Sequence, residues 1–552
     1  TTLFRSGGGG TTEDMIERGL RMARGIPGCP RVTMETSRAY FERTAKQLQD
    51  SPWLKRWVGE LYFEYHRGTY TSMARNKRAN RKAELLYQDA EFMAVLAGLS
   101  DGKAYPADRL AQGWEKILLN QFHDILPGSS IEPVYLDSQQ DYKQILDNGQ
   151  ELLDDSLDRI CSQIVTECQT AVIFNTTGFC RSDVACLPWP ADQPLPAVRD
   201  CHGDLLAVQQ TADGLLVCLP QVPAKGYTSL RLQPDVASDT ASPPASSLRV
   251  GTRCLENRFW LLELDEQARI TRLYDKTEAR EVLHPGAKAN VLRSFEDKPM
   301  GNDNWDIDIY YQQKSWEVSE LQVVEVVETG PVRIGLRITR PYQDSTIVQT
   351  IYLYDQVPRI DFATWIDWKE DETLLKVEFP VDIQADQATY DIQFGNITRP
   401  THWNTSWDWA RFEVCAHKWA DLSEEGYGVS LLNDCKYGHD IRDNVLRLTL
   451  LKSGNSPNPR ADREEHRFVY ALYPHAGTWR QADTMRQAYS LNQPLLARII
   501  AKKQEGSLPA TTGFLTVDKD HVLMETVKQA EDGQGVIVRL FEFKNRDRKS
   551  VV

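Results

Sequence analysis

The sequence predicts a multidomain α+β protein in which a helical bundle precedes a large region of stacked antiparallel β-sandwiches. Three observations support this prediction. The chain has 552 residues, which at about 150 residues per domain suggests three or four domains. Apolar residues recur with helical spacing up to about residue 164. Near Thr170 the period changes to two, as in strands with one buried face, and strand patterns continue to the end.

The composition indicates a soluble globular protein. Lys and Arg total 64 against 78 Asp and Glu, and the formal net charge of −14 repels the phosphate backbone of nucleic acids. No apolar run approaches the ~20 residues that span a bilayer, so we expect no membrane segment. The ten cysteines are scattered without a Cys-x-x-Cys pair, and we expect reduced thiols in a cytoplasmic setting.

The helical part begins near the amino terminus. Four glycines at 7–10 precede Thr11 and Asp14, which fit a capping box at the start of a helix over residues 15–21. The pattern then predicts helices over residues 33–48, 55–65, 79–96, 106–122 and 132–161. The last of these keeps a three-to-four spacing of apolar residues for roughly eight turns. We expect these helices to pack as a bundle.

The strand part begins with the apolar run over residues 171–174, which ends in the turn residues NTTG. Alternating patterns predict further strands over residues 332–339, 351–354, 360–362 and 536–543. The short return between the second and third of these fits an antiparallel pair. Because the strands are too many for one small sandwich, we expect several stacked sheets. A Pro-, Ser- and Ala-rich stretch over residues 234–248 is the expected loop or linker.

One polar pair lies at the end of the helix predicted over residues 106–122. His123 and Asp124 precede Pro127 and Gly128, which cannot continue a helix, so we expect the helix to stop near Leu126. A polar pair at a helix end can project into a cleft, where the imidazole can bind a metal. A histidine beside an apolar helix is more often structural, and the pair by itself leaves both interpretations open.

Tryptophans and acids gather in the second half of the chain. Eight of the fourteen tryptophans lie between Trp305 and Trp419, and acids flank them in NWDID at 304–308 and NTSWDW at 404–409. Aromatic faces beside carboxylates and amides suit sugar rings, which offer apolar faces and hydroxyl edges. The alternative is that these tryptophans pack between sheets.

A family resemblance follows from the segment NQFHDILPGSSI at 120–131. It resembles the signature of the glycoside hydrolase family 38 α-mannosidases, in the branch of bacterial and cytosolic or vacuolar enzymes. Four further segments agree with it, namely HRGTYTS at 66–72, WDIDIYY at 305–311, RFEVCAHKW at 411–419 and LLNDCKYG at 431–438. The resemblance covers essentially the whole chain and implies the carboxyl-terminal portion of such an enzyme.

The resemblance implies three parts of the chain. These are the end of a catalytic α/β barrel over residues 1–32, a three-helix-type bundle with the His–Asp motif over residues 33–165, and β-sandwich domains over residues 166–552. It also implies zinc-dependent, retaining hydrolysis of terminal α-D-mannosides. His123 becomes a ligand of one divalent metal, with zinc as the expected ion, and Asp124 a contact of sugar hydroxyls. The expected wall of the sugar pocket consists of Trp305, Asp306, Lys436 and Tyr437.

The catalytic carboxylates of the family have no candidates in this chain. The family's His-x-Asp pair and nucleophilic Asp should precede Thr1, and Ser6 stands where the acid/base Asp is expected. A hydroxyl cannot replace a carboxyl group of raised pKa as the proton donor. We therefore expect a partial chain that is inactive alone, with an α-mannoside or oligosaccharide as the substrate of the complete enzyme. The alternative is a non-catalytic carbohydrate-binding or assembly polypeptide, and either could form a homo-oligomer.

Overall fold

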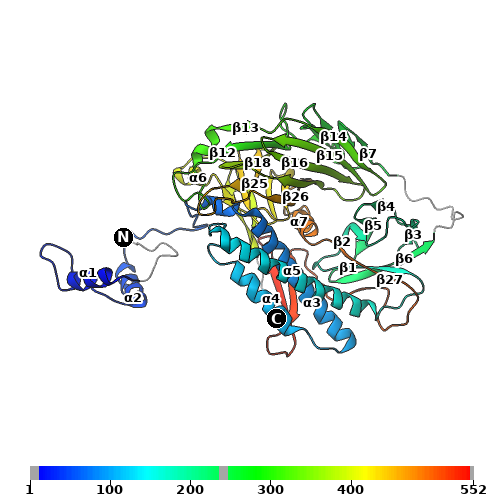
Figure 1. Cartoon of the computed structure of the whole chain (residues 1–552), viewed down its shortest axis with the longest axis horizontal. Coiled ribbons are helices and arrows are strands. Elements are labelled where there is room, and N and C mark those ends of the chain that lie inside the picture. The colour runs from blue at the N-terminus through cyan, green and yellow to red at the C-terminus, as the bar shows by residue number, and fades with distance from the viewer. Residues whose placement is uncertain (1–10, 235–245, 547–552) are drawn as a thin grey trace. The chain divides into compact units, whose positions relative to one another are not determined.

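Residues 11–234 and 246–546 are described by the computed structural model, in which the chain divides into two units between Tyr62 and Phe63 (Figure 1). Ser6, the four glycines and residues 235–245 of the expected linker lie outside the described residues.

The first unit contains two helices, α1 (Glu13–Ala23) and α2 (Ser37–Leu48), and neither buries a residue. The hydroxyl of Thr12 caps α1 by accepting a hydrogen bond from the Met15 amide at 3.2 Å. The predicted capping box at Thr11 and Asp14 is therefore wrong by one residue, because the helix already begins at Glu13. In the described residues 11–32, α1 is the regular element, and the end of a barrel there stays a prediction.

The helix predicted over residues 55–65 is absent, and this prediction is wrong. Gly59 adopts a φ of +111°, a left-handed conformation that interrupts a helix. Val58 and Leu61 are 81% and 82% exposed. No apolar face of the segment is buried against a partner that would stabilise a helix.

Three long helices of the second unit pack together, and their positions confirm the predicted helices. They are α3 (Ala74–Asp101), α4 (Ala107–Asn120) and α5 (Glu132–Cys161). Their apolar side chains share one core cluster. Helix α3 buries residues on all its sides, as expected of the helix that lies between its neighbours and the β region.

Tyr87 sets the spacing of these three helices. Its ring fills the space beside Gly113 of α4 and Gly149 of α5, where any Cβ atom would overlap the ring. The Tyr87 hydroxyl donates to the Ile145 carbonyl at 3.1 Å and accepts from Asn148 at 2.9 Å. The buried phenol is thus both packed and hydrogen-bonded, as a buried tyrosine requires.

The strands of the described residues form six sheets, and the ladders between these strands are antiparallel. This confirms the predicted combination of helices with many antiparallel strands. Two smaller sheets pack on each other through one apolar core. The first sheet contains β1 (Thr170–Asn175), β3 (Pro196–Arg199), β6 (Gly226–Pro234), β27 (Leu496–Ile500) and β28 (Thr511–Gly513). The second contains β2 (Arg181–Leu187), β4 (Val208–Thr211) and β5 (Gly214–Val222).

Two large sheets form the main sandwich. The nine-stranded sheet contains β14 (Val323–Thr329), β15 (Arg333–Tyr342), β16 (Ser345–Tyr354), β17 (Ile360–Asp367), β19 (Gln387–Ile392), β20 (Gly395–Pro400), β22 (Trp419–Ser423), β23 (Tyr427–Asn433) and β26 (Glu465–Ala476). The six-stranded sheet contains β12 (Val291–Glu296), β13 (Ser315–Glu317), β18 (Thr373–Pro380), β21 (Val414–Cys415), β24 (Gly438–Arg442) and β25 (Val445–Ser453). Phe379 of β18 lies 5.7 Å from Phe362 and 6.2 Å from Tyr470 between ring centroids, so aromatic rings join the two sheets.

The other elements are short. A five-stranded sheet contains β7 (Arg249–Gly251), β8 (Cys254–Glu256), β9 (Trp260–Leu264), β10 (Ile270–Asp275) and β11 (Arg280–Glu281), and a hairpin contains β29 (Val522–Gln529) and β30 (Val536–Glu542). Four helical segments connect strands or precede α3: η1 (Arg67–Tyr70), η2 (Ile309–Gln313), α6 (Ser406–Ala410) and α7 (Thr484–Asn492).

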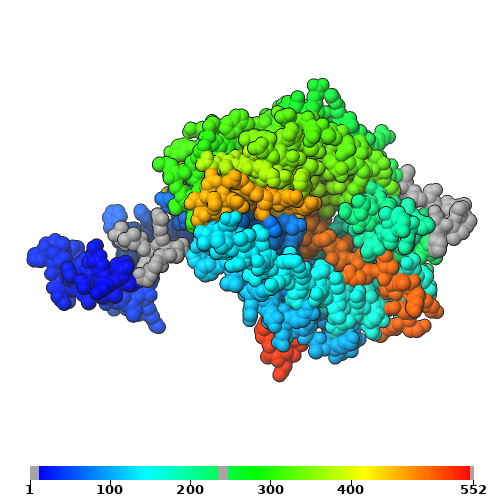
Figure 2. All heavy atoms as spheres, in the orientation of Figure 1, coloured from blue at the N-terminus to red at the C-terminus, as the bar shows by residue number. Residues whose placement is uncertain are grey.

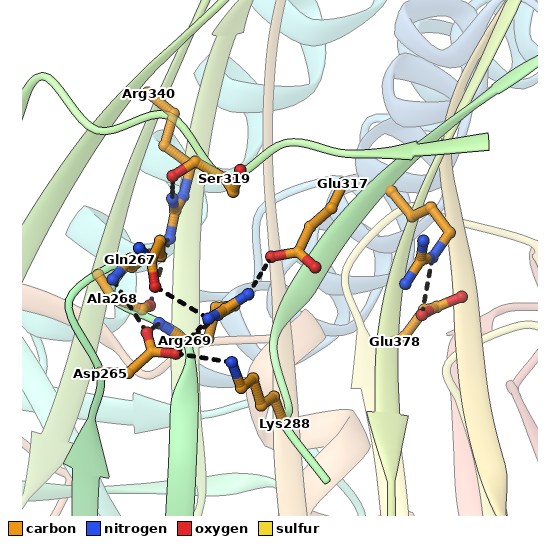
Figure 3. A network of polar contacts seen from close by, with 10 residues as sticks. Asp265, Gln267, Ala268, Arg269, Lys288, Glu317, Ser319, Arg340 and Glu378 are labelled. Atoms are coloured by element: carbon orange, nitrogen blue, oxygen red, sulfur yellow. Dashed lines mark hydrogen bonds and ion pairs between the residues drawn. The ribbon is translucent and has the colours of Figure 1, made fainter.

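An ion-pair network fixes the hairpin of β9 and β10 to the main sandwich (Figure 3). Arg269 bonds Asp265 of its own turn at 2.6 Å and Glu317 of β13 at 2.6 Å. Arg340 of β15 donates to the Gln267 carbonyl of the same turn at 2.5 Å. Burial alone would raise the pKa of Asp265, but hydrogen bonds from Arg269 and Lys288 outweigh it and hold that pKa at about 2.

Helix α3 is joined to the sandwich by buried polar contacts. Arg81 donates to Asn492 at the end of α7 at 3.0 Å. Both carboxylate oxygens of Asp462, which precedes β26, accept backbone amides of Met73 and Ala74 at the start of α3, each at 2.7 Å. In the space-filling view the orange segment around β26 and α7 lies between the green sandwich strands and the blue to cyan helices (Figure 2).

Candidate functional site

The His–Asp pair lies in a turn that follows α4, not in the helix itself. Helix α4 ends at Asn120, and residues 121–128 form turns, so the predicted stop near Leu126 is wrong by six residues. The Gln121 side chain donates to Asn80 and Glu84 of α3 at 3.1 and 2.8 Å. These two hydrogen bonds fix the first residue after α4 to α3.

His123 and Asp124 face each other at the surface. Their Nε2 and Oδ2 atoms are 3.3 Å apart, and the side chains are 44% and 30% exposed. The imidazole lies against the Phe122 ring, with 4.2 Å between ring centroids and 51° between the ring planes. The Asp124 Oδ1 atom accepts from the Ser129 hydroxyl at 2.8 Å, which fixes the carboxylate within its own turn. Both side chains are therefore oriented and open to a ligand.

Lys77 of α3 is hydrogen-bonded to the backbone of the turn. Its buried ammonium donates to the carbonyls of Ser72, Leu126 and Pro127 at 2.6, 2.8 and 3.1 Å. All three of its protons are thereby used. Burial lowers the pKa of Lys77 to about 7, although the charge of Asp462 acts in the opposite direction.

The segment that carries Trp305 and Asp306 meets this turn. The Asn304 side-chain amide donates to the Gly128 carbonyl at 3.2 Å, and the Ser72 hydroxyl donates to the Asn304 carbonyl at 2.7 Å. Gly128 has a φ of +94°, and a Cβ there would overlap the Ser72 carbonyl. The close approach of these backbones therefore requires glycine.

Asp306 is anchored by a third segment. Its Oδ1 accepts the backbone amide of His66, and its Oδ2 lies 3.8 Å from the His66 Nδ1. His66 has a φ of 65°, a left-handed conformation that aims its amide at this carboxylate. Asp306 is 7% exposed and Trp305 is half-buried beside it. The structure thus places the predicted residues Asp124, Trp305 and Asp306 on two connected segments, and His66 anchors the second of these from a third.

Lys436 and Tyr437 lie between β23 and β24. The Lys436 side chain is buried, donates to the Leu450 carbonyl at 2.5 Å and lies 4.1 Å above the Phe468 ring. Tyr437 points to α3, where its hydroxyl accepts from Arg81 at 2.9 Å. Burial raises the pKa of Tyr437 to about 12. Their role in a sugar pocket stays a prediction.

Tyr437 and the turn line the same cavity, which has a volume of about 730 Å³. Gln121, Leu126 and Pro127 contribute from the turn, and Arg81 and Glu84 contribute from α3. His417 lies on the wall with a pKa of about 3, lowered by burial and by the cations Arg81 and Lys418. Sequence reasoning missed the polar residues of α3, although Asn80, Arg81 and Glu84 recur at helical spacing.

A metal needs more ligands than this site offers. Structural zinc takes four protein ligands and catalytic zinc about three, whereas the described turn supplies the His123 imidazole and the Asp124 carboxylate. A second group of possible ligands consists of Asp462, Glu464 and His466. Their ligand atoms all lie within 4.8 Å of one another. Both oxygens of Asp462 already accept amides of α3. Neither place holds a complete donor set among the described residues.

Two further findings concern the cysteines and the apolar character of the helices. The cysteines are free thiols, as expected from their spacing. Among the described residues, no helix has both the length and the apolar character that crossing a membrane requires.

Comparisons with known proteins agree on one family. Residues 64–160 match the alpha mannosidase middle domain, and residues 255–460 match the glycosyl hydrolases family 38 C-terminal domain. The chain is 35% identical to alpha-mannosidase 2C1 of Homo sapiens over 98% of its own length and 50% of the human protein. It is 33% identical to alpha-mannosidase G of Dictyostelium discoideum over 97% of its own length and 52% of that protein.

The fold is also similar to a solved structure. A crystal structure of an alpha-mannosidase from Enterococcus faecalis V583 superposes with a TM-score of 0.80, covering 96% of this chain and 69% of that one at 18% identity. This similarity concerns the fold alone. The chain spans about half the length of the curated relatives it matches. It carries the alpha mannosidase middle domain and the carboxyl-terminal domain of glycoside hydrolase family 38.

Proposed function

We propose that this chain is part of an α-mannosidase that hydrolyses terminal α-D-mannosides with retention of configuration. The chain would supply one side of the sugar site, formed by the turn of His123 and Asp124 and the adjoining segment of Trp305 and Asp306. The contact between Asn304 and Gly128 carries this proposal, because it joins those two segments. The matches to proteins named alpha-mannosidase support the substrate class.

The chain's residues would act on the substrate by orientation. Asp124 has a carboxylate held by Ser129 and can accept hydrogen bonds from sugar hydroxyls. The half-buried Trp305 offers an apolar face to a sugar ring. His123 would be one ligand of a divalent metal, proposed to be zinc, whose remaining ligands come from outside this chain. When bound, zinc orients substrate oxygens and stabilises developing negative charge.

The chain alone is proposed to be inactive. Retaining hydrolysis needs a nucleophile and an acid/base carboxyl group ~5–5.5 Å apart, and we assign neither role to Asp124 or Asp306. Asp124 is bonded to Ser129, and Asp306 accepts the His66 amide. We place the complete enzyme in the cytoplasm, in accord with the free thiols.

The test uses protein that includes the portion of the relatives missing here. Release of p-nitrophenol from its α-mannoside is measured together with zinc content. We expect His123→Ala to lose at least about tenfold in turnover and to lower the zinc content, because catalytic zinc keeps about three protein ligands. His202→Ala, at an exposed histidine, should leave both unchanged. Full activity and full zinc content in His123→Ala would overturn the assignment.

A further inference from the structure

Two adjoining cavities beside the first turns of α3 share three residues, Arg78 of α3 and Arg467 and Phe468 of β26. Their volumes are about 470 and 640 Å³. We call the continuous space the arginine groove. Its other Lys and Arg residues are Arg75, Lys436 and Arg337.

Arg78 and Arg467 form no side-chain hydrogen bond or ion pair with any residue of 11–234 and 246–546. The Nε atom of Arg78 is also buried without a hydrogen-bond partner. By contrast, Arg75 is paired with Glu464 and Arg337 with Glu325. A buried guanidinium N–H without an acceptor is costly, and in the groove this applies to Arg78. Arg467 is exposed, so its donors are open to a ligand from the solvent.

The acids that line the groove have partners other than Arg78 and Arg467. Asp434 pairs with Lys82 at 3.0 Å and accepts the Val469 amide at 3.0 Å. Glu465 accepts the indole N–H of Trp365 at 3.2 Å. These carboxylates therefore do not satisfy the two arginines.

Lys436 is the third cation of the groove that has no ion pair among the described residues. Its ammonium has the Leu450 carbonyl as acceptor. The pKa of Lys436 is lowered mainly by burial, and the charge of Arg78 lowers it further. Cys435, Asp462 and Asp434 act in the opposite direction. The charge of an anion in the groove would likewise act against the lowering.

We propose that the arginine groove binds an oxyanion of the phosphate class, either free or carried by a sugar. The planar guanidinium presents paired N–H donors that match two oxygens of a tetrahedral anion. Arg78 and Arg467 enter from a helix and from a strand, so an anion between them would be bound from two sides. Trp365, which pairs with Arg467 across β17 and β26 and lines the larger cavity, offers a face for an attached sugar. The proposal concerns binding and makes no use of the proposed hydrolysis.

The test is a calorimetric titration of the 552-residue chain with inorganic phosphate and, separately, with a hexose 6-phosphate, at an ionic strength held constant with chloride. We expect binding that weakens at least about tenfold in the double variant Arg78→Gln/Arg467→Gln. Equal affinity for the two compounds identifies the free anion as the ligand, whereas tighter binding of the hexose phosphate identifies the sugar-borne one. Absence of binding in both titrations overturns the proposal, as does equal binding by the double variant.

Two controls separate binding from folding. Arg272→Gln removes an arginine of β10 that is paired with Glu281, and it should bind phosphate as the parent chain does. Because the double variant loses no side-chain hydrogen bond described in the structure, its melting temperature without phosphate should match that of the parent. Phosphate should raise the melting temperature of the parent and of Arg272→Gln but not that of the double variant. A rise of equal size in all three would contradict the proposal.

Discussion

The side-chain amide of Asn304 donates to the carbonyl of Gly128 at 3.2 Å across 176 residues of sequence. Asn304 is fully buried. This one bond joins the segment of Trp305 and Asp306 to the turn of His123 and Asp124. The relative position of the two predicted parts of the site therefore depends on a residue that is itself hidden from solvent.

Replacement of Asn304 by alanine should increase local opening of the turn more than it increases opening elsewhere in the protein. The Gly128 carbonyl loses its donor, at a cost of about 1–2 kcal/mol in the free energy of unfolding. Hydrogen exchange of the amides in residues 121–130 should accelerate relative to that of α5. Asn404→Ala, at an exposed asparagine, is the control and should change neither. Unaltered exchange in residues 121–130 would show that the bond does not hold the turn.

Gly128→Ala tests the close approach of the turn to Ser72. Alanine at a φ of +94° costs about 1–2 kcal/mol, and its Cβ would also overlap the Ser72 carbonyl. Gly203 has nearly the same φ, +93°, and a Cβ added there would meet no atom within 4 Å, so Gly203→Ala measures the backbone cost alone. Urea titrations should find Gly128→Ala less stable than Gly203→Ala by roughly 1–3 kcal/mol. Equal losses would argue against the overlap.

Lys77→Met tests the hydrogen bonds from Lys77 to the turn. The thioether keeps the length of the side chain but leaves the carbonyls of Ser72, Leu126 and Pro127 without their shared donor. We expect a loss of about 2–4 kcal/mol in the free energy of unfolding. Lys143→Met removes an exposed lysine of α5 that pairs with Asp147, and its unfolding should be indistinguishable from that of the parent. A similarly small effect at Lys77 would mean that the turn is held by other contacts.

The helical fold was predictable where apolar spacing coincides with packing. Helix α5 (Glu132–Cys161) has the predicted bounds, because its apolar residues recur on a face that is buried. The segment over residues 55–65 also contains apolar residues, but Gly59 is left-handed and Leu61 is exposed. A helical pattern without a buried face is a weak prediction, since most helical stability comes from tertiary packing.

Of the candidate site, the sequence predicts the motif of His123 and Asp124 but not the residues that fix its position. His123 and Asp124 could be selected because a proline and a glycine follow them. Lys77 and Asn304, which fix the turn, are far from it in sequence, and no local pattern indicates which distant carbonyl a buried lysine will contact. Lys436 was expected on a pocket wall for sugar, and the structure places its ammonium on the Leu450 carbonyl. Tertiary contacts of this kind carry no signal in a single sequence.

Buried histidines should make the protein unstable in mild acid. The pKa of His439 is lowered to about 4 by burial, and Arg399, Lys376 and Arg81 act in the same direction. Burial likewise lowers the pKa of His466 to about 3. An unfolded histidine titrates near 6.5, so below that pH the unfolded chain binds protons that the native chain does not. The stability that these neutral imidazoles contribute is complete above pH ~6.5 and is lost as pH falls towards 4.

His439→Gln isolates one of these groups. The glutamine amide can still donate to the Tyr437 carbonyl, which the His439 Nδ1 contacts at 3.0 Å, but it cannot take up a proton in this range. Between pH 6 and 4, the slope of the free energy of unfolding against pH should fall by up to about 1.4 kcal/mol per unit. The slope is informative even if the variant is less stable overall, since a loss of packing is independent of pH. His202→Gln, at an exposed histidine, should keep the parent slope, and an identical slope in His439→Gln would refute the role assigned to His439.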